Sequence, residues 1–409
     1  MRAVIAAAPS GATITFAPGV TTVTLTSGEL AITRNLTIVA GLARVTITRS
    51  AAPETPQFRV LRIDEGAIVT LQRLTIANGN NATFSGGGIA NINSTLTLLS
   101  CVVSDNTAGA GGGIVNYADT SDATLTVIGT AISDNSAYEA GGIYNDSRNG
   151  QASVFLINSR VSGNAATSGG GGIVNRRVVA AADQSGAAAL AITNSVVSGN
   201  VAGKDGGGIA NVASGGTATL TIDRSTIANN SAATNGGGID NGASSDGFAN
   251  VSITRSTISG NSAHSGGGLY NVILSATVNA FILNSTISGN RALHSGGGIG
   301  NNAAVGDLAL ILDSVTMVDN IADSDHDGMG LGHQLYISAY TNGRARTTVG
   351  KSVFGHADAA LTNYFAAIAG GTGSITQVSF GFNISQRDLP FCLGTAILQI
   401  PIPARPTGG

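Results

Sequence analysis

Residues Ser262–Asn271 read SAHSGGGLYN, three glycines followed by an apolar residue, a variable residue and an asparagine. The motif stands thirty residues earlier as AATNGGGIDN and thirty residues later as ALHSGGGIGN. The asparagine that closes the motif occurs at eight positions, most of them 30 residues apart: Asn91, Asn116, Asn145, Asn175, Asn211, Asn241, Asn271 and Asn301. A fixed period of this length indicates a repeat architecture.

A second asparagine column, from Asn106 to Asn320, lies between the glycine motifs. The positions three and eight residues before each of these asparagines are always apolar, and the position ten residues before is also apolar. Polar or variable residues separate the last two positions, as in LTID and VSIT. This alternation indicates short β-strands with one apolar face.

A single unit of this kind cannot bury its apolar face, but stacked copies can. We therefore predict an all-β fold, a right-handed parallel β-helix (β-solenoid) of the pectin lyase-like kind, with about 30 residues per coil. Coils spaced as paired strands give roughly fourteen coils in one rod. A helical solenoid is disfavoured, because repeated glycines and β-branched residues oppose helix formation.

The glycines are interpreted as corners of the coil, where a positive φ costs little only for glycine and, next, for asparagine. We expect the closing asparagines, at a second corner, to stack into a hydrogen-bonded ladder along the rod. A phosphate-binding loop needs one glycine-rich turn before a helix. Here eight such turns precede strands, which favours a structural role.

The pattern predicts one domain over residues 1–400. Residues 1–80 are expected to form irregular N-terminal coils, residues 81–320 the eight glycine-motif repeats, and residues 321–400 the closing coils. Residues 401–409, PIPARPTGG, have the composition of a linker tail.

Composition and charge exclude several classes of protein. The net charge is −3 and no basic cluster is longer than Arg176-Arg177, so we expect no nucleic-acid binding. No stretch approaches the ~20 apolar residues of a transmembrane helix. Met1–Ala8 is too short for a secretory signal, so we expect a removed signal or a longer gene product. Cys101 and Cys392 are interpreted as free thiols, Cys101 as a buried small residue.

The repeat also resembles a known family. SGGGIxN paired with STISGNSA resembles the repeats of polymorphic outer-membrane-protein-like and related bacterial surface proteins. AVIAAAPSGATITFAPGV is similar to the segment after the CSLREA motif of such proteins, here without the cysteine. FGFNISQRDLPFCL is similar to the closing region of the choice-of-anchor type. The resemblance implies a right-handed parallel β-helix and an exported, surface-associated protein, and it implies no catalytic residues.

One segment has the pattern of a calcium loop. Asp323, Asp325 and Asp327 alternate and Gly328 follows, as in the first half of an EF-hand loop. The twelfth position is Gln334, where an EF-hand has a bidentate glutamate. A weaker calcium site and a solvated acidic loop are both left open, and calcium is the one cofactor the sequence suggests.

Two further groups of residues are candidate sites. His264 and His294 occupy the same position of adjacent units, so their rings are expected to stack, without an obvious third metal ligand. Arg176, Arg177 and Asp183 lie in the longest unit, where a catalytic cluster on the wall of the rod would be sought. The other carboxylates are scattered and form no pair in one column.

The function expected from these features is non-catalytic. The chain would be a rigid stalk or adhesin-like module, extracellular or at the cell surface of a bacterium, presenting corner loops such as 176–187 and 242–248. Its partner would be a glycan or a surface protein of a host or neighbouring cell. The alternatives are a polysaccharide lyase or glycoside hydrolase with clustered carboxylates, and a structural subunit of a surface layer or filament that self-associates through the helix ends.

Overall fold

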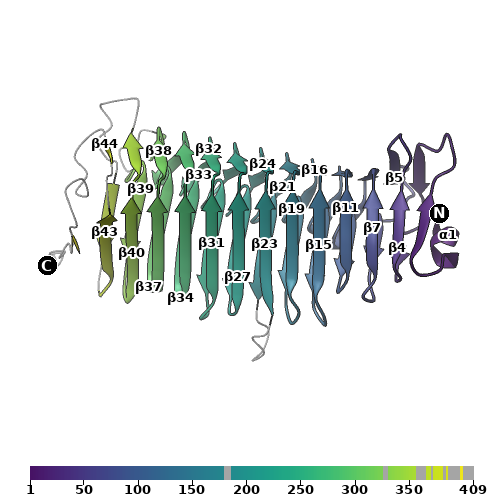
Figure 1. The fold of residues 1–409 in the computed structure, drawn as a ribbon, viewed down its shortest axis with the longest axis horizontal. Helices are drawn as coiled ribbons and strands as arrows, with labels where there is room; N and C mark the ends of the chain where they lie inside the picture. The colour runs from purple at the N-terminus through teal and green to yellow at the C-terminus, as the bar shows by residue number, and fades with distance from the viewer. Residues whose placement is uncertain are drawn as a thin grey trace.

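The computed structural model describes residues 1–178, 186–325, 330–355, 365–369, 372–380, 384–385 and 397–398. The described strands stack, almost all of them parallel, into a rod that runs from β1 (Ala12–Thr15) near one end to β43 (Ser374–Phe380) near the other (Figure 1). It makes about 11 turns of about 30 residues. The predicted all-β parallel solenoid is confirmed, the expected number of coils is slightly too high, and the right-handed sense stays a prediction.

The strands form three sheets. The large sheet contains β1 (Ala12–Thr15), β3 (Leu30–Ile32), β4 (Leu36–Val39), β6 (Leu61–Ile63), β7 (Ile68–Gln72), β10 (Ile89–Ile92), β11 (Thr95–Leu99), β14 (Ile114–Ala118), β15 (Ala123–Ile128), β18 (Ile143–Ser147), β19 (Ala152–Ile157), β22 (Ile173–Val178), β23 (Ala187–Thr193), β26 (Ile209–Ser214), β27 (Thr217–Asp223), β30 (Ile239–Ser244), β31 (Phe248–Thr254), β34 (Leu269–Leu283), β37 (Ile299–Asp313), β39 (Leu335–Ala339), β40 (Gly343–Gly350), β42 (Phe365–Ala369), β43 (Ser374–Phe380) and β45 (Ile397–Leu398). The second sheet contains β2 (Thr22–Leu25), β5 (Val45–Arg49), β8 (Leu74–Ala77), β12 (Val102–Ser104), β16 (Ala131–Ser133), β20 (Arg160–Ser162), β24 (Val196–Ser198), β28 (Thr226–Ala228), β32 (Thr257–Ser259), β35 (Thr286–Ser288), β38 (Thr316–Val318), β41 (Val353–Gly355) and β44 (Ile384–Ser385). The third sheet contains β9 (Asn80–Ser85), β13 (Thr107–Ala110), β17 (Ser136–Glu139), β21 (Ala165–Ala166), β25 (Val201–Ala202), β29 (Ser231–Ala232), β33 (Ser262–Ser265) and β36 (Arg291–Ser295).

Each coil from β10 to β33 contributes two strands to the large sheet and one to each of the others, and in the next two coils one long strand, β34 or β37, replaces the pair in the large sheet. In one such coil β26 and β27 belong to the large sheet, β28 to the second and β29 to the third. The register between coils follows the repeat, since Ile209 pairs with Ile239 and Asn211 with Asn241. The sequence period therefore sets which residues of neighbouring coils lie side by side.

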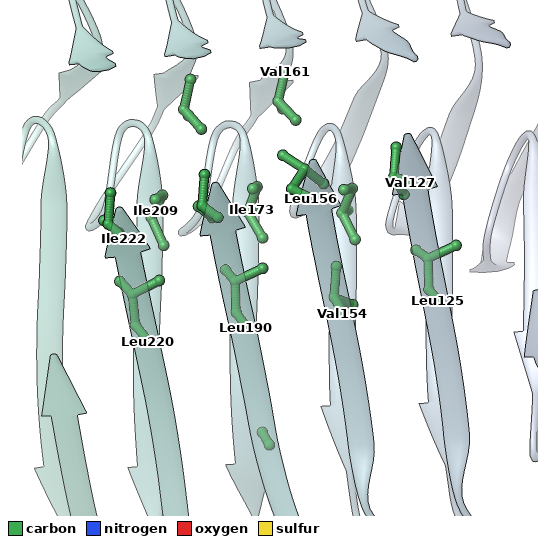
Figure 2. Close-up of a cluster of buried hydrophobic side chains, with 14 of the residues drawn as sticks. Leu125, Val127, Val154, Leu156, Val161, Ile173, Leu190, Ile209, Leu220 and Ile222 are labelled. Atoms are coloured by element: carbon green, nitrogen blue, oxygen red, sulfur yellow. The ribbon is translucent and has the colours of Figure 1, made fainter. Parts of the chain in front are cut away.

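The apolar columns form one continuous core. Leu220, Ile222, Ile227 and Ile239 of neighbouring strands have no exposed surface. The equivalent residues of the other coils stack beside them along the rod (Figure 2). Each coil buries its apolar face against the next coil, so the core is as long as the array of repeats.

The glycine motif combines two different requirements. The first glycine has a positive φ, as in Gly206 (φ 67°), and in one unit Ala140 takes this conformation instead (φ 56°). The other two glycines are needed for close approach. A Cβ on Gly207 would lie 2.4 Å from the carbonyl oxygen of Gly237, and one on Gly208 2.6 Å from that of Gly238. The backbone of the next coil occupies the space a side chain would need.

The eight asparagines that close the motif are fully buried and form a continuous ladder. Each Nδ2 donates to the Oδ1 of the asparagine in the next coil at 2.7–3.0 Å. The ladder ends at Asn91, whose Oδ1 is unpaired, and at Asn301, whose Nδ2 is unpaired, because Ile63 and Ile337 are the next residues in register.

The expected corner at these asparagines is wrong. They lie within strands, as Asn211 does in β26, and none of them has a positive φ. Their inward side chains are held by hydrogen bonds, so the backbone continues as a strand. The turn is made instead at the second asparagine column, where the preceding residue takes a positive φ, such as Gly199 (φ 65°).

The second asparagine column forms a ladder of its own. The backbone N–H and the Nδ2 of Asn200 both donate to Oδ1 of Asn230, at 3.0 and 2.9 Å. This column ends at Asn320, whose Nδ2 donates to Oε1 of Gln334 at 2.5 Å. Two polar ladders thus accompany the apolar core and satisfy amide groups that have no access to water.

Two buried residues in the first hundred or so positions complete the core. Helix α1 (Arg2–Ala7), which the sequence did not predict, places Ile5 in the core. Cys101 is a buried free thiol that lies 3.3 Å from the carbonyl oxygen of Leu71, and burial raises its pKa. The interpretation of Cys101 as a buried small residue is confirmed, and Cys392 lies outside the described residues.

Candidate functional site

The structure describes the second of the two predicted corner loops in full and the first only in part. Residues 179–185 of the first loop, including Asp183, lie outside the described residues. Most of the second loop, 242–248, belongs to β30 and β31, and a short turn at Ser245 and Asp246, both with positive φ, joins them. This segment therefore offers one tight turn and the end of a strand to a partner, and no extended loop.

The calcium segment is described in part. Asp323 has a positive φ of 63°, Asp325 is exposed, and Asp327 lies outside the described residues. Within the described part of the chain, no three His, Cys, Asp or Glu side chains are grouped so that they could hold a metal ion. The calcium site at Asp323, Asp325 and Asp327 stays a prediction.

The histidine pair is stacked as expected. The ring centroids of His264 and His294 are 5.5 Å apart and the rings are nearly parallel, with an interplanar angle of 7°. Nδ1 of His264 lies 3.3 Å from the hydroxyl of Ser265. No third metal ligand joins the two rings among the residues described, so the pair is a stack of imidazoles.

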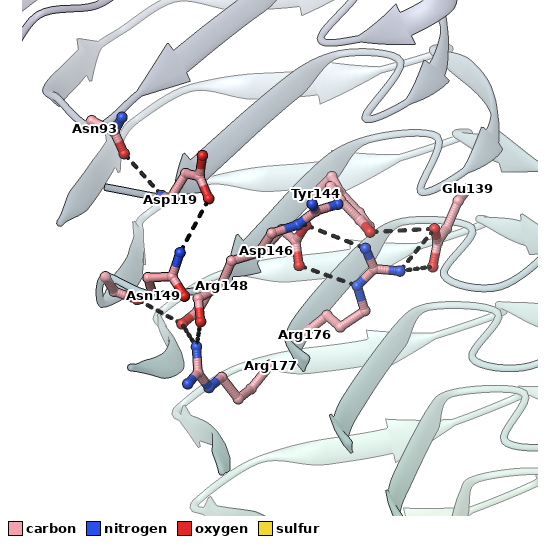
Figure 3. Close-up of polar contacts among 11 residues, drawn as sticks. Asn93, Asp119, Glu139, Tyr144, Asp146, Arg148, Asn149, Arg176 and Arg177 are labelled. Carbon is pink, nitrogen blue, oxygen red and sulfur yellow. Dashed lines mark hydrogen bonds and ion pairs between the residues drawn. The ribbon is translucent and has the colours of Figure 1, made fainter. Parts of the chain in front are cut away.

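Arg176 is the centre of a polar network on the outer face of the rod (Figure 3). It donates from Nε and Nη2 to the two carboxylate oxygens of Asp146, at 3.1 and 3.2 Å, and from Nη1 to Glu139 at 3.3 Å. Its guanidinium carbon lies 4.8 Å from the centre of the Tyr144 ring, and the Tyr144 hydroxyl donates to Glu139 at 3.3 Å. Strands β18 and β22 place Asp146 and Arg176 side by side in register.

The charges of this network largely compensate one another. Burial lowers the pKa of Arg176, but its hydrogen bonds to Asp146 and the nearby negative charges outweigh burial and raise the pKa overall. Burial raises the pKa of Tyr144 well above its ordinary value. Arg176 is therefore a fixed cation whose charge is offset by two carboxylates, which suits a structural clamp better than catalysis.

Arg177, the neighbouring residue, points into the rod. Its side chain is fully buried, and Nη1 lies 3.3 Å from the Ser147 hydroxyl and contacts the carbonyl oxygen of Arg148. Arg176 and Arg177, which the sequence placed together, thus belong to opposite faces of one strand. Arg176 is held in ion pairs and Arg177 is buried, so neither side chain is available to act on a substrate.

A pocket of about 350 Å³ lies beside this network, within the size range of small-ligand sites. Apolar residues of four coils contribute to its wall: Val174, Ala210, Val212, Ala243, Val272 and Leu274. The charged residues on the wall are Glu139, Lys204, Asp205 and Asp240. Lys204 and Asp205 directly precede one glycine motif, and Asp240 lies in the motif of the next coil.

Asp240 is the unusual member of this group. It is 6% exposed, and its Oδ1 has no hydrogen-bond partner. Burial, and secondarily the charge of Asp205, raise the pKa of its carboxyl well above the usual range. Perturbed carboxyl groups in pockets are candidates for functional sites.

The sequence contains one signal for Asp240. Asp240 occupies the variable position of GGGIxN, where the flanking coils have Ala210 and Tyr270. This position faces outward, yet the glycine corner covers it, so Ala90, Val115, Tyr144, Val174 and Ala210 form a small buried cluster there. A charged residue in an otherwise apolar column marks the site, and only the tertiary structure shows that Asp205 lies close to it.

Comparison with known proteins identifies no relative: no family model, no curated protein and no solved structure matches the chain. The class of protein that the fold defines is therefore a parallel β-solenoid, and the resemblance to a family of surface proteins stays a prediction. Across the described residues, no helix is both long enough and apolar enough to span a membrane.

Proposed function

We propose that this chain is the rigid rod of an exported bacterial surface protein and that the pocket around Asp240 binds a glycan without cleaving it. The observation that carries the proposal is the pocket itself, which combines apolar walls with a few converging polar groups on a stiff scaffold. Two amide ladders and a continuous core hold the coils in fixed register, which suits presentation of a site away from a cell. The resemblance to polymorphic outer-membrane-protein-like repeats supports the surface location.

The test is a binding screen of the full chain on immobilised glycans, run with calcium and with chelator. Leu274→Glu is the informative variant, because Leu274 lines the pocket and is 60% exposed, so the change is compatible with folding. Leu42→Glu is the matched control, since Leu42 is fully exposed on the N-terminal part of the rod. Binding that is weakened by the first change and kept by the second supports the proposal. Binding unaffected by Leu274→Glu contradicts the assignment of the pocket.

Polysaccharide cleavage is the second candidate, and one observation favours it. Asp205 and Asp240 bring two carboxyl groups to the same pocket, and glycoside hydrolases use a pair of carboxyl groups. Hydrolase and lyase assays on the same glycans, following new reducing ends and unsaturated products, separate the two functions. If the wild-type chain forms product, the function is polysaccharide cleavage and not binding alone.

The third candidate, a shell or filament subunit joined through open helix ends, gains no specific support. An uncovered first coil would favour it, whereas α1 packs there and buries Ile5. Sedimentation of the purified chain over a range of concentrations tests self-association directly.

A further inference from the structure

The side chain of Asp240 has a defined place in the fold. It lies on β30 between Ala210 of β26 and Tyr270 of β34, on the outward face of the large sheet. The corner of the coil covers it to 6% exposure, and the part that remains accessible lines the pocket. The carboxyl group is therefore largely desolvated, with Oδ1 buried, and only its small exposed part faces the pocket.

The charged groups around the pocket leave no excess of either sign. Glu139 is engaged by Arg176 and by the Tyr144 hydroxyl, and Asp146, which shares Arg176, is also paired with Arg148 at 3.8 Å. Asp205 and Lys204 carry opposite charges at the rim, and the Asp205 carboxylate accepts from the backbone N–H of Asn235 at 3.1 Å. Tyr270, the neighbour of Asp240 on the next strand, has a hydroxyl that accepts from Asn302.

The surroundings of Asp240 favour its protonated form. Burial and the nearby Asp205 both oppose ionisation and raise the pKa of the carboxyl. None of the ion pairs between described residues includes it. A protonated carboxyl offers one O–H donor together with an acceptor, and Oδ1 is still unpartnered.

We infer that this pocket is a subsite for one uncharged sugar ring, in which the exposed part of the Asp240 carboxyl hydrogen-bonds to a ring hydroxyl. The apolar residues Val212, Val272 and Leu274 offer a surface for the C–H face of the ring. The balanced charges at the rim give no preference for an anionic or a cationic ligand. This inference rests on the proposed glycan-binding function and names the chemistry of its ligand.

The experiment measures binding of the full chain to three probes by titration calorimetry. The probes are neutral gluco-, manno- and galacto-oligosaccharides, partially deacetylated chitosan oligosaccharides as the cationic arm, and oligogalacturonates as the anionic arm. Asp240→Asn keeps a donor and an acceptor in the same shape but cannot ionise. Asp240→Leu removes both. Asp246→Asn makes the same chemical change on the exposed turn of this coil and is the matched control.

We expect a neutral oligosaccharide to bind best. Asp240→Asn should bind it within about threefold of the wild type, and Asp240→Leu should lose about tenfold or more, the loss expected for buried hydrogen bonds to a hydroxyl. The wild-type affinity should fall as the pH rises through the pKa of Asp240, because the ionised carboxyl no longer donates. Asp240→Asn should show no such fall, and Asp246→Asn should behave as the wild type does.

Each contrary result has a distinct meaning. Preference for chitosan oligosaccharides with loss in Asp240→Asn would make the pocket a cation site and overturn the inference, as would preference for oligogalacturonates. Neutral binding that Leu274→Glu weakens and Asp240→Leu leaves unchanged would refute the inference alone. Neutral binding that neither change affects would place the glycan elsewhere on the rod and would also refute the assignment of the pocket in the proposed function. Binding of no probe would refute both the inference and the proposed function. Circular dichroism and melting curves of each variant verify that the rod is folded.

Discussion

Removal of one rung from the buried asparagine ladder should cost more in the middle of the rod than at its end. In Asn211→Ala the Nδ2 bond to Asn241 at 2.8 Å and the bond received from Asn175 at 2.7 Å are lost. Asn175 keeps its bond to the carbonyl oxygen of Thr219 at 3.1 Å, whereas Oδ1 of Asn241 loses its partner.

The magnitude follows from these bonds. The two amide–amide hydrogen bonds contribute about 1 kcal/mol each, and a buried unpaired acceptor costs about 1–3 kcal/mol more, so Asn211→Ala should lower the free energy of unfolding by at least about 4 kcal/mol. Both changes also remove two Nδ2 bonds to backbone carbonyl oxygens, which cancel in the comparison. Asn91→Ala loses one amide–amide bond and leaves Oδ1 of Asn116 unpaired, but it also removes an Oδ1 that is already unpaired. Its cost should therefore be about 2 kcal/mol.

The assay is urea unfolding followed by far-ultraviolet circular dichroism, with amide hydrogen exchange to locate the effect along the rod. A double variant, Asn211→Ala with Asn241→Ala, should cost less than the sum of the single changes, because the unpaired acceptor is removed as well. Equal costs at Asn211 and Asn91, or a cost below about 1 kcal/mol at Asn211, would refute the view that the ladder bonds stabilise the stack.

Three other predictions address the corner, the pocket carboxyl and the acidic segment. Gly208→Ala should destabilise the rod by about 3 kcal/mol, because its Cβ would meet a backbone oxygen of the next coil. Gly289→Ala, with φ 63° and open space around it, should cost only about 1 kcal/mol in urea unfolding. The raised pKa of Asp240 means that the folded chain keeps a proton that the unfolded chain loses above about pH 4. The free energy of unfolding of the wild type, relative to that of Asp240→Asn, should therefore fall as the pH rises, by up to about 1.4 kcal/mol per pH unit, until the pH passes the pKa of Asp240 in the folded chain. Curves of stability against pH that run parallel for the two proteins would contradict this prediction. If Asp323, Asp325 and Asp327 bind calcium, added calcium should raise the Tm and Asp325→Asn should remove the rise, whereas an unchanged wild-type Tm would refute the site.

The sequence by itself determined the architecture and the register. Because every coil must bury the same apolar columns, the spacing of residues such as Ile209 and Ile239 was enough to predict strands, sheet type and the side-by-side placement of equivalent positions. The stacked histidines and the buried Cys101 followed from the same reasoning.

The tertiary structure alone decided where polar residues of different columns meet. Glu139 reaches Arg176 across 37 residues, and Asp205 influences Asp240 from the preceding coil, because the glycine corner brings two faces of the rod together. The repeat fixes contacts within a column, but contacts between columns depend on the path of the corner and on side-chain burial. For that reason the sequence predicted the ladder of amides, and the structure revealed the pocket.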